Sequence, residues 1–151
     1  MHGIGRFGDV LGKGLLAGLA GTAAITISQM IEMKITKRQP STAPAEAATK
    51  VLDVKAVSEN EKSKFSQGVH WAYGTSWGVT RGVLSLAGLK GITATSIHFV
   101  SILGTAMVML PALKVAPPVK EWGWKGILKD AMHHAVYAVA AGLFFDAINE
   151  H

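Results

Sequence analysis

Apolar residues are grouped into four long stretches along this chain, and polar stretches separate them. The stretches cover residues 11–33, 69–89, 92–113 and 127–148, and each is 21–23 residues long. A bilayer hydrocarbon core of about 30 Å needs about 20 residues of α-helix to cross it. The pattern therefore predicts an all-α fold, a four-transmembrane-helix bundle that forms a single integral membrane domain over residues 1–151.

The polar stretch at 34–67 predicts a loop that contains short helical segments. Residues 45–54 have a helix-forming composition and are expected to lie along the membrane surface. Ser58 is followed three residues later by Glu61, the arrangement of a capping box. We therefore expect a helix to begin at Ser58 and to continue without a break into the second apolar stretch.

Small residues recur at every fourth position in the first two apolar stretches and form a ridge on each predicted helix. Such ridges let two helix backbones approach closely inside a membrane. The pattern predicts tight packing against a partner that is either in the same chain or in a neighbouring copy. The ridge residues are Gly14, Gly18 and Thr22 in the first stretch and Gly74, Gly78 and Gly82 in the second.

A short motif occurs twice, once near the start of each even-numbered apolar stretch. It consists of His-x-x-Tyr, a small residue and a further glycine four positions later, and it begins at His70 and again at His134. This agreement favours two helical hairpins in the same orientation, related as a parallel internal repeat about an axis along the membrane normal.

The basic residues indicate both a partner and an orientation. The net charge is +5, but Lys and Arg flank the apolar stretches and do not cluster with aromatic side chains, which favours lipid headgroups over nucleic acid as partners. With four spans, three basic residues lie on the side of both termini and eleven on the side of the two longer loops. The positive-inside rule then places loops 34–67 and 114–126 in the cytoplasm and both termini outside.

Several ionisable side chains are expected inside the bundle, where they are costly and hence candidates for function. Four interpretations stay open for the layer nearest the cytoplasm: hydrogen bonds between its members that fix helix register, proton or cation handling, a haem held between His70 and His134, and a divalent-metal site. The absence of cysteine excludes disulfides and thiolate ligands. The residues of this layer are Glu32, His70, Asp130, His133 and His134.

A second polar layer lies nearer the outer side. Arg81 and Asp146 are expected to form an ion pair that neutralises a costly intramembrane charge, with an anion or lipid headgroup on Arg81 as the functional alternative. His98 stands alone in the third stretch and is expected to be a packing residue.

The His-x-x-Tyr-Gly motif at His70, the segment 110–113 with the Pro117–Pro118 pair after it, and the second His-x-x-Tyr at His134 resemble small bacterial inner-membrane proteins of the YagU-like kind. The resemblance implies a four-helix protein of the bacterial inner membrane with no assigned biochemical function, and it brings no catalytic residues. The polar loop at 34–67 is longer here than in that family.

Enzyme signatures are missing from the sequence: it contains no GxSxG, no P-loop and no GxGxxG that opens a helix after a strand. We therefore expect a non-enzymatic membrane protein that associates with itself or serves as an accessory subunit of a larger membrane complex. The alternatives are a proton or ion channel or transporter that uses the His/carboxylate layer, and an electron carrier with a bis-His haem.

Overall fold

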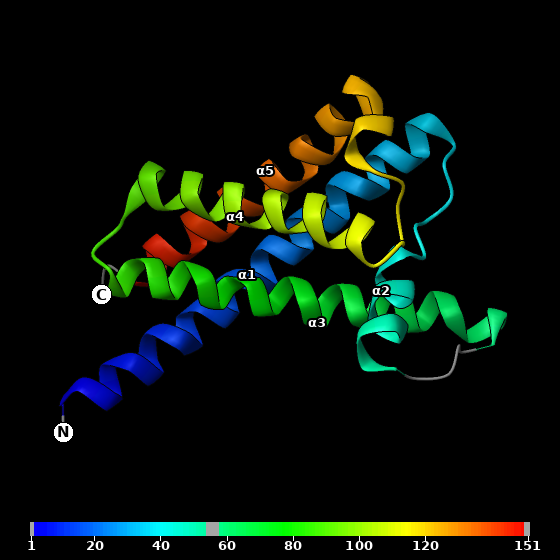
Figure 1. The fold of residues 1–151 in the computed structure, drawn as a ribbon. Coiled ribbons are helices and arrows are strands. Elements are labelled where there is room, and N and C mark those ends of the chain that lie inside the picture. Colours follow the sequence, from blue (N-terminus) through cyan, green and yellow to red (C-terminus); the bar gives the residue numbers. More distant parts are fainter. Residues whose placement is uncertain (1, 54–57, 150–151) are drawn as a thin grey trace.

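The computed structural model describes residues 2–53 and 58–149, and the regular elements in these ranges are all helical, as predicted. Figure 1 shows their arrangement in space. In chain order the elements are α1 (His2–Thr36), α2 (Ala43–Leu52), α3 (Glu59–Leu86), α4 (Gly91–Ala112), the 3-10 turn η1 (Val119–Glu121) and α5 (Gly123–Asn149).

The four long helices pack as a bundle in which each runs back along the one before it. Helix α1 packs against both α3 and α5, and α4 packs against α5 and, over a smaller area, against α3. In Figure 1, α1 and α5 follow one diagonal while α3 and α4 cross them. Both termini and the α3–α4 turn lie at one end, called here the terminus end, and α2, η1 and the end of α4 lie at the opposite end, the loop end.

The expectation of four apolar membrane-spanning helices holds for three of the described helices but not for the second predicted span. Three of the described helices are long and apolar enough to cross a membrane: Gly5–Thr36, Gly91–Ala112 and Gly123–Asn149. Helix α3 is long enough, but its predicted span is rich in glycine, serine and threonine and also carries His70 and Arg81. The three apolar helices indicate a membrane protein.

The helices also extend beyond the predicted spans. Helix α1 covers 35 residues, and α5 begins four residues before the expected start of its apolar stretch. Ser58 does precede α3 as its N-cap residue, but the hydroxyl group makes no bond to the helix backbone and donates instead to the Glu61 carboxylate at 2.8 Å. The predicted capping box is thus a side-chain pair in the structure.

Helix α2 is tied to the loop end of the bundle. It spans Ala43–Leu52, close to the predicted 45–54, of which residue 54 lies outside the described residues. The Lys50 ammonium donates to the carbonyl oxygens of Leu113 and Lys114 at 2.7 and 2.9 Å, beyond the last turn of α4. A cation is favourable at a helix C-terminus, because the helix dipole is negative there. Helix α2 also packs along the first turns of α3.

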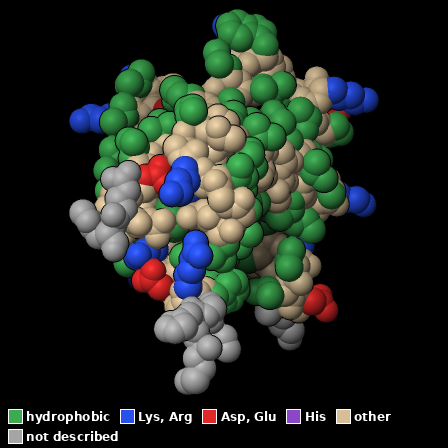
Figure 2. Space-filling view, turned by 90° about the vertical axis from the view of Figure 1, so that its left-hand side faces the viewer, with side chains coloured by type: hydrophobic (Ala, Val, Ile, Leu, Met, Phe, Trp, Pro, Cys, Tyr) green, Lys and Arg blue, Asp and Glu red, His purple; other side chains and the backbone are tan. Residues whose placement is uncertain are grey.

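The outer surface of the bundle is largely apolar. Figure 2 looks at the terminus end and shows hydrophobic side chains over much of this face, with lysine and arginine side chains projecting from it. Large hydrophobic side chains are exposed on every apolar helix, among them Leu16 and Ile27 on α1, Val100 and Val108 on α4 and Leu143 on α5. Lipid or a protein partner would cover such surface in a membrane.

Candidate functional site in the bundle interior

The closest approach of two helices in the bundle is the crossing of α1 and α3 at glycine. A Cβ atom added to Gly14 would lie 2.7 Å from the Gly78 carbonyl oxygen, closer than real Cβ contacts come. A Cβ atom on Gly78 would in turn collide with the backbones of Gly14 and Gly18. Only glycine permits this contact, so its occurrence at three facing positions has a direct steric cause.

The contact continues toward both ends of the crossing. A Cβ atom on Gly82 would lie 2.8 Å from the Val10 carbonyl oxygen, and one on Gly74 would collide with the Thr22 side chain. All six residues predicted to form packing ridges therefore lie between α1 and α3 of the same chain. Of the two alternatives left open by the sequence, the geometry favours the intramolecular one.

Beside this glycine ridge, α3 presents a polar face to the other helices. It consists of positions 70, 74, 77, 81 and 85, whose spacing of three or four residues places them along one side of the helix. The face extends over about 22 Å at 1.5 Å per residue. At each position a side chain or a backbone carbonyl of α3 bonds to a group on α1, α4 or α5.

The first two contacts of the polar face lie toward the loop end. His70 Nε2 is 3.0 Å from the Thr26 hydroxyl of α1. Since that hydroxyl donates its own hydrogen to the Thr22 carbonyl at 2.6 Å, it accepts the bond from His70. Four residues on, the Gly74 carbonyl oxygen accepts from the Tyr137 hydroxyl of α5 at 2.6 Å. Gly74 thus leaves room for Thr22 and also binds Tyr137.

The middle contact of the polar face joins α3 to α4. The His98 ring is fully buried and its Nε2 lies 3.0 Å from the Trp77 carbonyl oxygen. A carbonyl can only accept, so Nε2 carries the hydrogen and Nδ1 of the neutral ring keeps a lone pair. Nδ1 is buried without a hydrogen-bond partner among the described residues. The ring also meets that of Tyr137 edge-on, with 5.7 Å between centroids.

The contacts at the terminus end join α3 to α5. Arg81 pairs with Asp146 through Nη2, which is the ion pair predicted from the sequence. The Arg81 side chain is 0% exposed and that of Asp146 is 30% exposed, so the cation is the more deeply buried partner. The guanidinium also lies 4.6 Å from the centroid of the Phe145 ring, within range of a cation–π interaction. Asn149 reaches Ser85 at 3.5 Å, the longest contact of the series.

Glu32, in the predicted inner layer, is engaged by basic residues near the loop end. One oxygen of its carboxylate, Oε2, accepts both from Arg38 Nη2 at 2.8 Å and from Arg38 Nε at 3.1 Å. Lys129 of α5 lies 3.5 Å from the other carboxylate oxygen, and the Thr36 hydroxyl donates to that oxygen at 3.1 Å. This cluster connects the end of α1 to the first turns of α5.

The other residues of the predicted inner layer form separate pairs. His133 Nδ1 is 2.8 Å from the Ser28 hydroxyl of α1. His134 Nδ1 lies 2.8 Å from the Asp130 carbonyl oxygen one turn earlier in its own helix and 3.6 Å from the Asp130 carboxylate. The predicted inner layer is therefore a set of separate pairwise contacts. The expectation that its members form a hydrogen-bond network with one another is wrong.

The haem and metal interpretations find little geometric support in this layer. His70 Nε2 is bonded to Thr26 of α1, whereas His134 bonds within its own helix through Nδ1 and keeps Nε2 as its open ring nitrogen. In the part of the chain that the structure describes, no group of three or more histidine, aspartate or glutamate side chains is placed to hold a metal ion.

Several residues that bond between the helices were not singled out from the sequence. Tyr137 was noticed only as part of the repeated motif, Thr26 only as a continuation of the ridge on the first stretch, and Ser28 and Ser85 were not weighed as site residues. The repeated motif suggests equivalent roles for its two tyrosines, but these roles differ in the structure. Tyr137 is buried, whereas its counterpart Tyr73 is exposed and contacts the Trp77 ring. The sequence carried little signal for the polar face, because only positions 70, 81 and 85 bond through side chains, whereas positions 74 and 77 bond through backbone carbonyls.

No family model, curated protein or solved structure matches this chain. The resemblance to the YagU-like proteins therefore stays a prediction from short motifs.

Proposed function

We propose that this chain is a non-enzymatic integral membrane protein of the bacterial inner membrane, with a structural role as a self-associating protein or an accessory subunit of a larger membrane complex. The support is the division of the molecule into a polar interior, bonded within the chain, and an apolar exterior that nothing in the chain covers. The resemblance to the YagU-like proteins agrees with this location.

In this proposal α3 crosses the membrane with the three apolar helices. Helix α1 ends at the loop end and α4 starts at the terminus end, so the chain must return between the two ends, and α3 provides that return. Its low apolar content is tolerated because its polar groups bond to α1, α4 and α5 instead of facing lipid. The excess of basic residues at the loop end supports a cytoplasmic location for that end.

The observation that carries the proposed role is the outer face of α4. Ile97, Val100, Gly104 and Val108 are spaced three or four residues apart and are exposed, while Ala94, His98 and Ile102 are buried on another side of the helix. Nothing lies within 4 Å of the position of a Cβ atom on Gly104. A glycine flanked by stiff β-branched side chains is typical of a surface against which a second helix packs.

Gly104→Leu tests this role, because the added side chain projects from the bundle and leaves its interior unchanged. Native mass spectrometry of protein gently extracted from its own membranes should show wild-type particles larger than one 15.9 kDa chain, either multiples of it or assemblies with other subunits. The variant should shift these particles toward the single chain, while thermal unfolding in detergent stays unchanged.

Gly8→Leu is the matched control, since Gly8 is equally open but lies on α1. It should leave the assembly intact. A wild-type protein that always appears as one chain would contradict the proposed role, and an assembly that tolerates Gly104→Leu would exclude the α4 face as its interface.

A second candidate function is proton or ion movement, favoured by the depth over which the polar face of α3 extends. Its buried contacts at His98, Tyr137 and Arg81 lie between the two ends of the bundle. Purified protein in vesicles with an enclosed pH-sensitive dye should then dissipate a pH gradient, and His98→Phe should abolish this. Dissipation of the pH gradient no faster than in vesicles without protein would exclude the function.

A further inference from the structure

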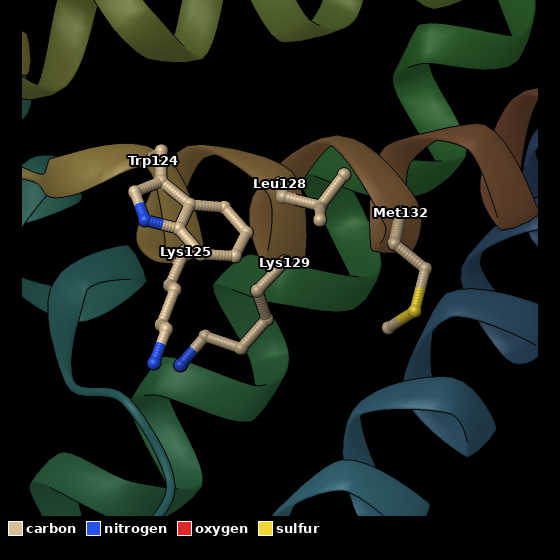
Figure 3. A pocket seen from close by; sticks show the side chains of 5 residues that line it. All are labelled: Trp124, Lys125, Leu128, Lys129 and Met132. Atoms are coloured by element: carbon tan, nitrogen blue, oxygen red, sulfur yellow. The ribbon is translucent and has the colours of Figure 1, made fainter.

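An open groove runs along the first turns of α5 at the loop end, outside the polar interior. Figure 3 shows that its lining comes entirely from α5 and that two lysine side chains extend from the helix in the same direction. The lining forms two rows at four-residue spacing, one basic and one apolar. These residues are Lys125 and Lys129 in the basic row and Trp124, Leu128 and Met132 in the apolar row.

The basic row has more positive charge than its surroundings neutralise. Two lysines four residues apart on a helix repel each other. The nearby Glu32 lies 3.5 Å from Lys129, but it is already held by Arg38 at 2.8 Å. Arg38 and Lys129 therefore share one carboxylate. The Lys125 ammonium nitrogen lies 5.6 Å from the centroid of the Trp124 ring. An anion between the two ammonium groups would relieve this repulsion.

The apolar row supplies the other half of an amphipathic site. Trp124 is 70% exposed, and Leu128 and Met132 are exposed along the same side of α5 toward the middle of the bundle. Tryptophan favours the headgroup level of a bilayer, where its ring is partly apolar and partly hydrated. From Trp124 to Met132 the groove thus passes from the interface into the hydrocarbon region, over about 12 Å at 1.5 Å per residue.

We propose that this groove binds an anionic phospholipid. The phosphate of the headgroup lies between the ammonium groups of Lys125 and Lys129, and an acyl chain lies along Leu128 and Met132. The loop end carries most of the basic residues, which is where the anionic lipids of a cytoplasmic leaflet would be encountered. The site does not depend on whether the protein associates with itself or with other subunits.

Lys125→Gln/Lys129→Gln tests the site in the full-length protein. The protein in a neutral detergent is mixed with equal amounts of phosphatidylglycerol and phosphatidylcholine, and native mass spectrometry counts the lipids retained on each chain. The wild type should retain phosphatidylglycerol preferentially. The double variant should bind it about thirty-fold more weakly, as expected from the loss of two basic residues near a charged surface.

Lys64→Gln/Lys120→Gln is the matched control, because it removes the same charge from exposed lysines of α3 and η1 outside the groove. It should keep the preference for phosphatidylglycerol. Equal retention of the two lipids by the wild type, or an equal loss in both double variants, would overturn the proposal. Displacement of the lipid by millimolar inorganic phosphate would also overturn it, because the acyl chain would then contribute nothing.

Discussion

At the scale of single residues, Arg81 shows how a charge is kept inside this bundle. Its side chain is fully buried, Asp146 neutralises it, and the Phe145 ring covers one face of the guanidinium. The sequence was sufficient to predict this pair, because two opposite charges at similar depth in apolar helices have few other partners. It was not sufficient to predict that Tyr137 binds Gly74, because the acceptor is a backbone carbonyl, and every residue carries one.

Asp146→Leu should destabilise the protein by about 3–5 kcal/mol, because it leaves the buried Arg81 charge without a partner. The double variant Arg81→Leu/Asp146→Leu should recover most of this loss, since both charges are then removed. Chemical unfolding in detergent, followed by circular dichroism, measures both effects.

Asp9→Leu is the comparison for that measurement. Asp9 pairs with Lys13 at 2.9 Å near the terminus end, and its side chain is 57% exposed. An exposed pair contributes little, so this variant should change stability by no more than about 1 kcal/mol. A double variant at 81 and 146 as unstable as Asp146→Leu alone would show that Arg81 has a role other than balancing Asp146.

At the scale of elements, α3 explains where sequence-based prediction succeeded and where it failed. The glycine ridge was predictable, because four-residue spacing of small residues has one common structural meaning in a membrane. The polar face was not, because His70, Arg81 and Ser85 looked like isolated interruptions of an apolar stretch. Their partners come from three other helices, so only the packed bundle shows that they form one face.

Gly78→Ala should weaken the contact of α1 with α3, because the new methyl group would overlap backbone atoms that cannot rotate away. Overpacking of this kind costs roughly 1–3 kcal/mol. Thermal unfolding in detergent should show a clear decrease in midpoint. Gly104→Ala introduces the same methyl group where nothing lies within 4 Å, and it should leave the midpoint unchanged or raise it slightly. Equal effects at the two positions would contradict the packing described for α1 and α3.

At the scale of the whole molecule, the fold is a bundle whose polar groups are directed inward and whose large apolar side chains are directed outward. The all-helical class and the hairpin order of the long helices followed from the lengths of the apolar stretches. In the proposed membrane arrangement all four long helices, α3 included, cross the membrane together, so that the terminus end and the loop end lie on opposite sides.

Labelling of single cysteines tests this claim most directly, because the chain contains no cysteine of its own. Ser41, Lys90 and Lys120 are exposed in the α1–α2, α3–α4 and α4–α5 connections, and each can be replaced by cysteine in turn. In intact cells treated with a membrane-impermeant maleimide, the account predicts labelling of Lys90→Cys and protection of Ser41→Cys and Lys120→Cys until the membrane is opened. If the cysteines at 41 and 90 are reached from the same side, α3 does not cross the membrane and the account is wrong.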